Sequence, residues 1–146
     1  MFPIMKPLLA LIVVLLAVAA FAQPANTIAA SQTLDPKDLT TLLPQKPLIL
    51  NVGPRTIYAQ AHIPGAEYVG MTSEPDGIKA LREHVRNVPK TRFIVIYCGC
   101  CPWNRCPNVA PAYTELKSLG FKNVKVLHIA QNFGADWVSN GFPAEK

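Results

Sequence analysis

Arg92-Phe-Ile-Val-Ile-Tyr-Cys-Gly-Cys-Cys-Pro-Trp-Asn-Arg-Cys-Pro-Asn108 joins a strand pattern to a loop that holds all four cysteines of the chain. Residues 92–97 are mostly apolar, β-branched or aromatic, which predicts a buried strand. Residues 109–119 have a helical pattern, with Asn108 in the N-cap position and Gly120 after the last turn. In open α/β sheets, sites lie at the carboxyl edge of the strands, where helix-terminal and loop N–H groups lower the pKa of a thiol. The stretch therefore predicts reactive sulfur chemistry at a strand end.

Strand and helix patterns alternate on both sides of this stretch. The expected strands cover residues 48–52, 68–69, 92–97 and 124–129, and the expected helices cover residues 36–43, 57–60, 76–85, 109–119 and 135–140. Such alternation within a single small domain is typical of parallel strands joined by helical crossovers. We therefore predict an α/β fold with a mainly parallel sheet flanked by helices.

Residues 1–22 have the pattern of a signal peptide. Lys6 precedes an apolar run over residues 7–20, and Ala20-Phe-Ala22 matches a cleavage site, so we expect cleavage after Ala22. An uncleaved anchor is the alternative, but the run is short for a span of about 20 residues. We expect residues 23–34 to be a flexible leader and residues 35–146 to be one domain. The mature protein would be periplasmic or secreted, with no stable insertion into the membrane.

The charge of the chain limits the partners that it favours. Its net charge is +5, but the basic residues are scattered and not grouped with aromatic side chains. A nucleic-acid-binding surface normally carries a basic stripe or patch, so we expect no nucleic-acid partner. A mild attraction for small anions is the most that this charge supports.

Export changes how the cysteines are interpreted. In an oxidising compartment, four cysteines are normally two disulfides. These four lie within residues 98–106, however, and closing so short a loop constrains the unfolded chain little. The pattern therefore favours a chemical role over a scaffolding role.

Two parts of the sequence resemble the rhodanese-like domain family, the fold of sulfurtransferases. The first is Leu48-Ile-Leu-Asn-Val-Gly-Pro-Arg-Thr-Ile-Tyr-Ala-Gln-Ala-His-Ile-Pro-Gly-Ala66, which is similar to the family's apolar strand and Gly-His-Ile-Pro-Gly-Ala element. The second comprises Ile94-Val-Ile-Tyr-Cys98, Leu119-Gly-Phe-Lys-Asn-Val124 and Trp137…Gly141-Phe-Pro143. Together they span nearly all of residues 35–146. The resemblance implies a rhodanese-like α/β fold, in which the cysteine after the strand, Cys98 here, accepts a sulfane sulfur as a persulfide.

The sequence departs from the family outside the cysteine loop at two places. The Asp and Arg that follow the family's first strand are Asn51 and Gly53 here, so that charged pair is lost. The family's Gly-Gly after the last strand is replaced by residues 130–133. The fold prediction is unaffected, but the family's standard substrate does not follow automatically.

The active loop also departs from the family spacing. The family has Cys-x4-Arg followed by Ser or Thr, whereas Arg105 lies seven positions after Cys98 and five after Cys100. Counted back from Gly120, the family's Arg falls on Asn108, so the loop carries about five inserted residues. An enlarged loop is also found in rhodanese-related phosphatases, but theirs has a different spacing and one cysteine.

These patterns define the candidate site residues. We expect Cys98 to be the nucleophile, and Cys101 to be a resolving thiol. A local Cys98–Cys101 or Cys101–Cys106 disulfide is the alternative. Arg105 and Asn108 are candidates for binding a small sulfur-containing anion such as thiosulfate, and a thiol is a candidate acceptor. An exposed loop arginine without a ligand is the alternative for Arg105.

The main hypothesis is a sulfurtransferase that needs no cofactor. The alternative is a non-catalytic module that cycles a dithiol with a protein partner or binds a soft metal. In that case the ligands would be Cys98, Cys100, Cys101 and Cys106. Copper(I) suits such ligands better than zinc, because structural zinc sites usually have two ligand pairs well apart in sequence.

Overall fold

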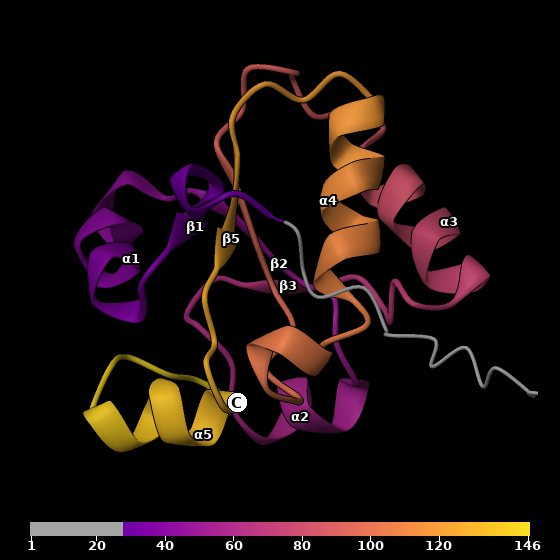
Figure 1. Cartoon of the computed structure of the whole chain (residues 1–146). Helices are drawn as coiled ribbons and strands as arrows, with labels where there is room; N and C mark the ends of the chain where they lie inside the picture. Colours follow the sequence, from indigo (N-terminus) through magenta and orange to yellow (C-terminus); the bar gives the residue numbers. More distant parts are fainter. Residues whose placement is uncertain (1–27) are drawn as a thin grey trace, which may run out of the picture.

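A parallel five-stranded sheet forms the centre of the structure, a computed structural model that describes residues 28–146 (Figure 1). The strands lie in the order β1-β5-β4-β2-β3, and every neighbouring pair is parallel. Their bounds are β1 Thr33–Leu34, β2 Leu48–Asn51, β3 Glu67–Tyr68, β4 Ile94–Tyr97 and β5 Val124–Leu127. The predicted signal peptide lies outside the described residues. Within residues 28–146, no helix is both long and apolar enough to cross a membrane.

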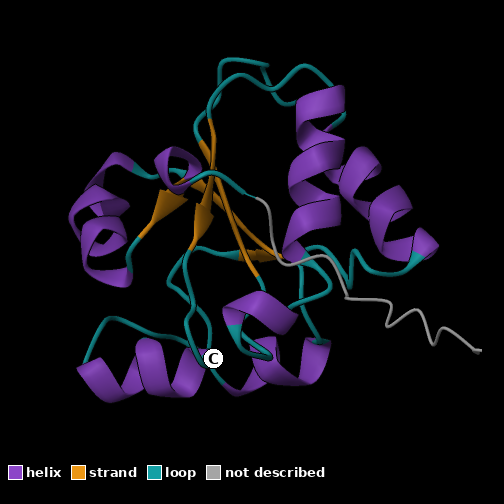
Figure 2. Ribbon diagram, in the orientation of Figure 1, coloured by secondary structure: helices purple, strands orange, loops and turns teal. Residues whose placement is uncertain are grey.

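Helices cover both faces of this sheet (Figure 2). Helices α3 and α4 pack on one face, and α1 and α5 pack on the other (Figure 1). The bounds are α1 Pro36–Leu42, α2 Arg55–Gln60, α3 Pro75–Val85, α4 Val109–Ser118 and α5 Phe133–Asp136. The predicted α/β fold with a parallel sheet and flanking helices is therefore confirmed.

Side chains alternate between two hydrophobic cores along the central strands. Ile94 and Ile96 of β4 pack with α3 and α4, whereas Val95 and Tyr97 pack with α1 and α5. All four β4 side chains are buried, because a strand between two helical layers has no solvent face. Tyr97 is the last β4 residue, so the chain leaves the sheet at Cys98, still inside the molecule.

The end of the predicted leader needs correction. Thr33 and Leu34, assigned to the flexible leader from sequence, form β1 and pair with Val126 and Leu127 of β5. The two-residue strand has too short a pattern to be recognised locally, and the neighbouring strand supplies its hydrogen bonds.

Asn108 occupies the predicted N-cap position of α4, but its side chain makes no capping hydrogen bond. The expected capping role of this side chain is therefore wrong. Gly120 adopts a positive φ of 87° after the helix, which matches its predicted place beyond the last turn.

The side of the sheet on which successive strands are added changes between β2 and β4. After β2 the chain adds β3 on one side, then crosses to β4 and β5 on the other. At such a point the connections diverge, which leaves room for a site beyond the carboxyl ends of the two strands. Gly53 follows β2 and Cys98 follows β4 at this edge.

Candidate active site

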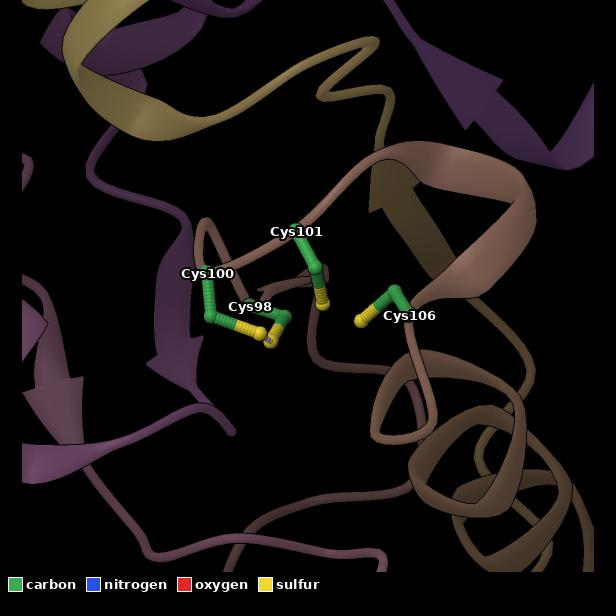
Figure 3. A group of neighbouring side chains, drawn as sticks. All are labelled: Cys98, Cys100, Cys101 and Cys106. Carbon is green, nitrogen blue, oxygen red and sulfur yellow. Dashed lines mark hydrogen bonds between the residues drawn. The ribbon is translucent and has the colours of Figure 1, made fainter.

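The four thiol groups converge at this edge of the sheet (Figure 3). The sulfur atoms of Cys98, Cys100, Cys101 and Cys106 all lie within 4.8 Å of one another. The Sγ atoms of Cys98 and Cys100 are 3.1 Å apart, and all four cysteines are free thiols. Cys98 and Cys106 are buried, with 2% and 8% of their surface exposed, and the other two are half-buried. The loop therefore forms one compact thiol cluster with a buried and an accessible side.

Two backbone hydrogen bonds fasten the loop to the segment after β5. The carbonyl of Gly99 accepts a bond of 2.9 Å from the N–H of Phe133, and the N–H of Trp103 donates to the carbonyl of Ala130 at 3.1 Å. Gly99 has a φ of 78°, and a Cβ there would lie 2.9 Å from the Cβ of Phe133. Only glycine fits this turn without strain, so the backbone of the inserted loop is tied to the domain.

Gly53 allows the end of β2 to approach the first thiol closely. A Cβ at this position would lie 2.6 Å from the carbonyl oxygen of Cys98 and 2.9 Å from its Sγ. The N–H of Gly53 donates to the Oδ1 of buried Asn51 at 3.1 Å. Cys98 therefore occupies the space that a side chain at position 53 would need.

The side chain of Asn108 binds the sulfur of Cys98. Its Nδ2 donates to Cys98 Sγ at 3.3 Å, and its Oδ1 accepts from the N–H of Ser73 at 2.9 Å. Its carbonyl accepts from the hydroxyl of Thr72 at 2.6 Å. Asn108 is 2% exposed, so its amide is engaged with protein groups. Sequence reasoning missed Thr72 and Ser73, because nothing in their segment indicates proximity to the cysteines.

Cys106 is the cysteine of the cluster whose pKa is lowered. Hydrogen bonds from Cys100 and Cys98 lower the pKa of Cys106 to about 3 against the opposing effect of burial, with help from the backbone N–H groups of Asn108 and Val109. These N–H groups lie at the start of α4, where the helix favours an anion. A thiol pKa is therefore lowered near the helix N-terminus, as expected from sequence, but at Cys106, three positions before Val109, and not at Cys98 at the strand end.

Cys98 and Cys100 hold their protons more tightly. The hydrogen bond with Cys100 lowers the pKa of Cys98, but the hydrogen bond with Cys106 and burial outweigh it and raise this pKa to about 12. The pKa of Cys100 is raised mainly by its hydrogen bonds with Cys106 and Cys98. At neutral pH the cluster thus contains an anionic sulfur that accepts hydrogen bonds from neighbouring thiols.

A cleft of about 400 Å³ reaches the cluster at Cys100. Its lining includes Ile57, Gln60, Gly99 and Phe133. Among the described residues that line the cleft, none carries a charge. The cleft therefore suits a neutral or largely apolar group beside the thiols.

The structure brings most of the predicted site residues together. Cys98, Cys101 and Asn108 lie in or against the cluster. Arg105 belongs to a one-turn helix, Trp103–Arg105, and its side chain is exposed. The roles of nucleophile, resolving thiol and anion-binding group stay predictions.

Sequence and structure comparisons place this site in a known family. A family model for the rhodanese-like domain matches residues 35–129. The chain belongs to the rhodanese-like domain family. None of the curated proteins compared with it matches its sequence.

Solved structures of other proteins share the fold. The rhodanese-like domain of an Anabaena protein is 25% identical, with 78% of each chain covered and a TM-score of 0.56. A Bacillus halodurans protein is 21% identical, with 79% of this chain and 77% of that chain covered and a TM-score of 0.60.

The protein EanB contains a region of the same fold. The matched region is 23% identical and covers 78% of this chain and 28% of the EanB chain, with a TM-score of 0.59. Its structure carries a cysteine persulfide in a tetrahedral intermediate state with ergothioneine. At this identity the likeness concerns the fold.

Proposed function

We propose that this protein is an exported sulfurtransferase that carries sulfane sulfur as a persulfide on Cys98. The observation that carries the proposal is the position of the Cys98 thiol directly after β4, held by Asn108 at 3.3 Å and grouped with three further thiols. EanB, part of which shares this fold, is solved with a cysteine persulfide, and this supports the same chemistry.

The first step moves one sulfur atom from the donor to Cys98. The Cys98 thiol loses its proton to solvent, and the thiolate, which the Asn108 amide and the hydrogen bond with Cys100 stabilise, attacks the outer sulfur of a donor such as thiosulfate. The bond between the two donor sulfurs breaks, and sulfite leaves with the bonding electron pair. One sulfur atom has then moved to Cys98, with no oxidant or reductant required.

The second step returns the enzyme to its starting state. A nucleophile such as a thiol attacks the outer persulfide sulfur, and Cys98 leaves as a thiolate that recovers a proton. The uncharged cleft beside Cys100 suits an organic thiol acceptor, and exposed Arg105 provides a positive charge for an anionic donor. Cys101 can instead attack the inner sulfur of the persulfide, which releases hydrosulfide and leaves a Cys98–Cys101 disulfide for a dithiol partner to reduce.

Single turnover with thiosulfate tests the proposal. The reduced protein is incubated with thiosulfate, and intact mass is measured before and after addition of cyanide. We expect one added sulfur atom on the wild type, removed by cyanide with formation of thiocyanate, and none on Cys98→Ser. The matched control is Cys101→Ser, which keeps the first step. Sulfur loading of folded Cys98→Ser at the wild-type rate would contradict the assignment of the nucleophile.

A further inference from the structure

The four-cysteine cluster has the composition and dimensions of a metal site. Each of Cys98, Cys100, Cys101 and Cys106 offers one sulfur ligand, and the four sulfur atoms lie within 4.8 Å of one another. We propose that the reduced cluster binds one copper(I) ion. This inference does not depend on the proposed sulfurtransferase activity, because it requires only that the thiols be reduced.

The sulfur spacing fits a single ion. With metal–sulfur bonds of about 2.3 Å, ligands of a tetrahedral ion lie about 3.8 Å apart, and those of a trigonal ion about 4.0 Å apart. The cluster spans this range, from 3.1 Å between the sulfurs of Cys98 and Cys100 to the outer limit of 4.8 Å. Side-chain shifts of less than about 1 Å, within the reach of small rotations about the side-chain bonds, therefore bring the sulfurs to bonding positions.

The surroundings of the cluster are already organised for anionic sulfur. Asn108 donates to the Sγ of Cys98, as outer hydrogen bonds do for metal ligands in general. The hydrogen bonds Phe133–Gly99 and Trp103–Ala130 hold the loop backbone, so metal binding costs little further conformational entropy of the loop. Cys98 and Cys106 form the buried side, and the half-buried thiols leave a route for the ion.

Ligand chemistry favours copper(I) over other ions. The ligand set consists of sulfur alone, and soft thiolates select copper(I), zinc or iron–sulfur clusters. Structural zinc takes four ligands, and four thiolates around one Zn²⁺ would leave two excess negative charges in a partly buried loop, at a high desolvation cost. Copper(I) can bind through two thiolates while the other two thiols stay protonated, which leaves one excess negative charge.

Metal and sulfur would then use the same atoms. A copper ion bound to Cys98 occupies the electron pair that attacks a sulfur donor in the proposed function, so the loaded protein should form no persulfide. The purified protein would alternate between a metal-bound state and a metal-free state that is open to sulfur donors.

The test is a competition titration of the purified protein, reduced and kept without oxygen. Copper(I) is added in the presence of bicinchoninate, whose coloured copper complex reports the metal that the protein has not taken. We expect one copper(I) per chain, withdrawn from the competitor, and a native mass that shows a single ion. Cys98→Ser with Cys106→Ser should lower the affinity at least about a hundredfold, and Cys101→Ser should lower it less.

A synthetic peptide of residues 98–106 is the matched control, because it carries the same thiols without the fold. We expect the peptide to bind at least about tenfold more weakly than the protein. Equal affinity of peptide and protein would overturn a site built by the fold, and more than one copper per chain would overturn the single-ion site. Tighter retention of zinc in a parallel competition would overturn the choice of copper(I). Sulfur transfer by the metal-free protein is measured separately, so failure of either proposal is recognised without the other.

Discussion

Replacing Asn108 by Asp changes one atom beside the nucleophile. Asn108→Asp keeps the oxygen that accepts from Ser73 and exchanges the N–H donor, 3.3 Å from Cys98 Sγ, for a carboxylate oxygen. Two unit charges at this distance repel by about 5 kcal/mol at an effective dielectric constant of about 20, which corresponds to almost four pKa units. The carboxylate relieves part of this repulsion by taking up a proton. We therefore expect persulfide formation at neutral pH to slow by at least about tenfold, or about 1.4 kcal/mol.

Stopped-flow measurement of single-turnover persulfide formation checks this expectation, with thermal unfolding measured in parallel. Thr72→Val is the matched control, because the Thr72 hydroxyl donates to the Asn108 carbonyl and not to sulfur. Its loss should cost about 1 kcal/mol or somewhat more of stability and leave the rate within about twofold. A wild-type rate in Asn108→Asp, or equal slowing in both variants, would show that the amide does not act on the Cys98 sulfur.

Three further predictions concern the cluster, the glycine beside it and the N-terminus. In the wild type, the rate of persulfide formation should rise with pH toward the pKa of Cys98, about 12, because only the Cys98 thiolate attacks the donor. In Cys106→Ser the rate at neutral pH should be higher, because the interaction with Cys106 raises the pKa of Cys98, and a wild-type rate that is independent of pH would contradict the Cys98 thiolate as the nucleophile. Gly53→Ala should lower stability by about 1–3 kcal/mol and also slow persulfide formation, since its Cβ would lie 2.9 Å from Cys98 Sγ. Gly120→Ala, strained by its φ of 87° but with nothing within 4 Å, should cost about 1 kcal/mol and leave the rate unchanged; equal rates in the two alanine variants would refute the steric role. N-terminal sequencing of the exported protein should begin at Gln23, and a chain beginning at residue 1 would contradict the predicted cleavage.

The local sequence determined the elements and their order. The apolar pattern of residues 92–97, the helical pattern of residues 109–119 and Gly120 after it each lie within a few residues of one another. Alternation of such patterns was enough to predict the parallel α/β fold, because burial on both faces of a central strand appears directly as a continuous apolar run. The short β1 strand was not predicted, since two residues have no periodicity and their partner β5 is distant in sequence.

Only the tertiary structure decided how the cysteines are used. Spacing placed four thiols in one loop, but the loop backbone, tied to the segment after β5, brings their sulfurs within 4.8 Å. Gly53 reaches the site from another strand, and Ser73 and Thr72 reach it through Asn108. The sequence predicted a thiolate near the helix N-terminus but not which cysteine would carry it. The pKa of a thiol depends on its distances to every donor and charge around it. Those distances exist only once segments far apart in the chain have packed together, and they lower the pKa of Cys106 and raise that of Cys98.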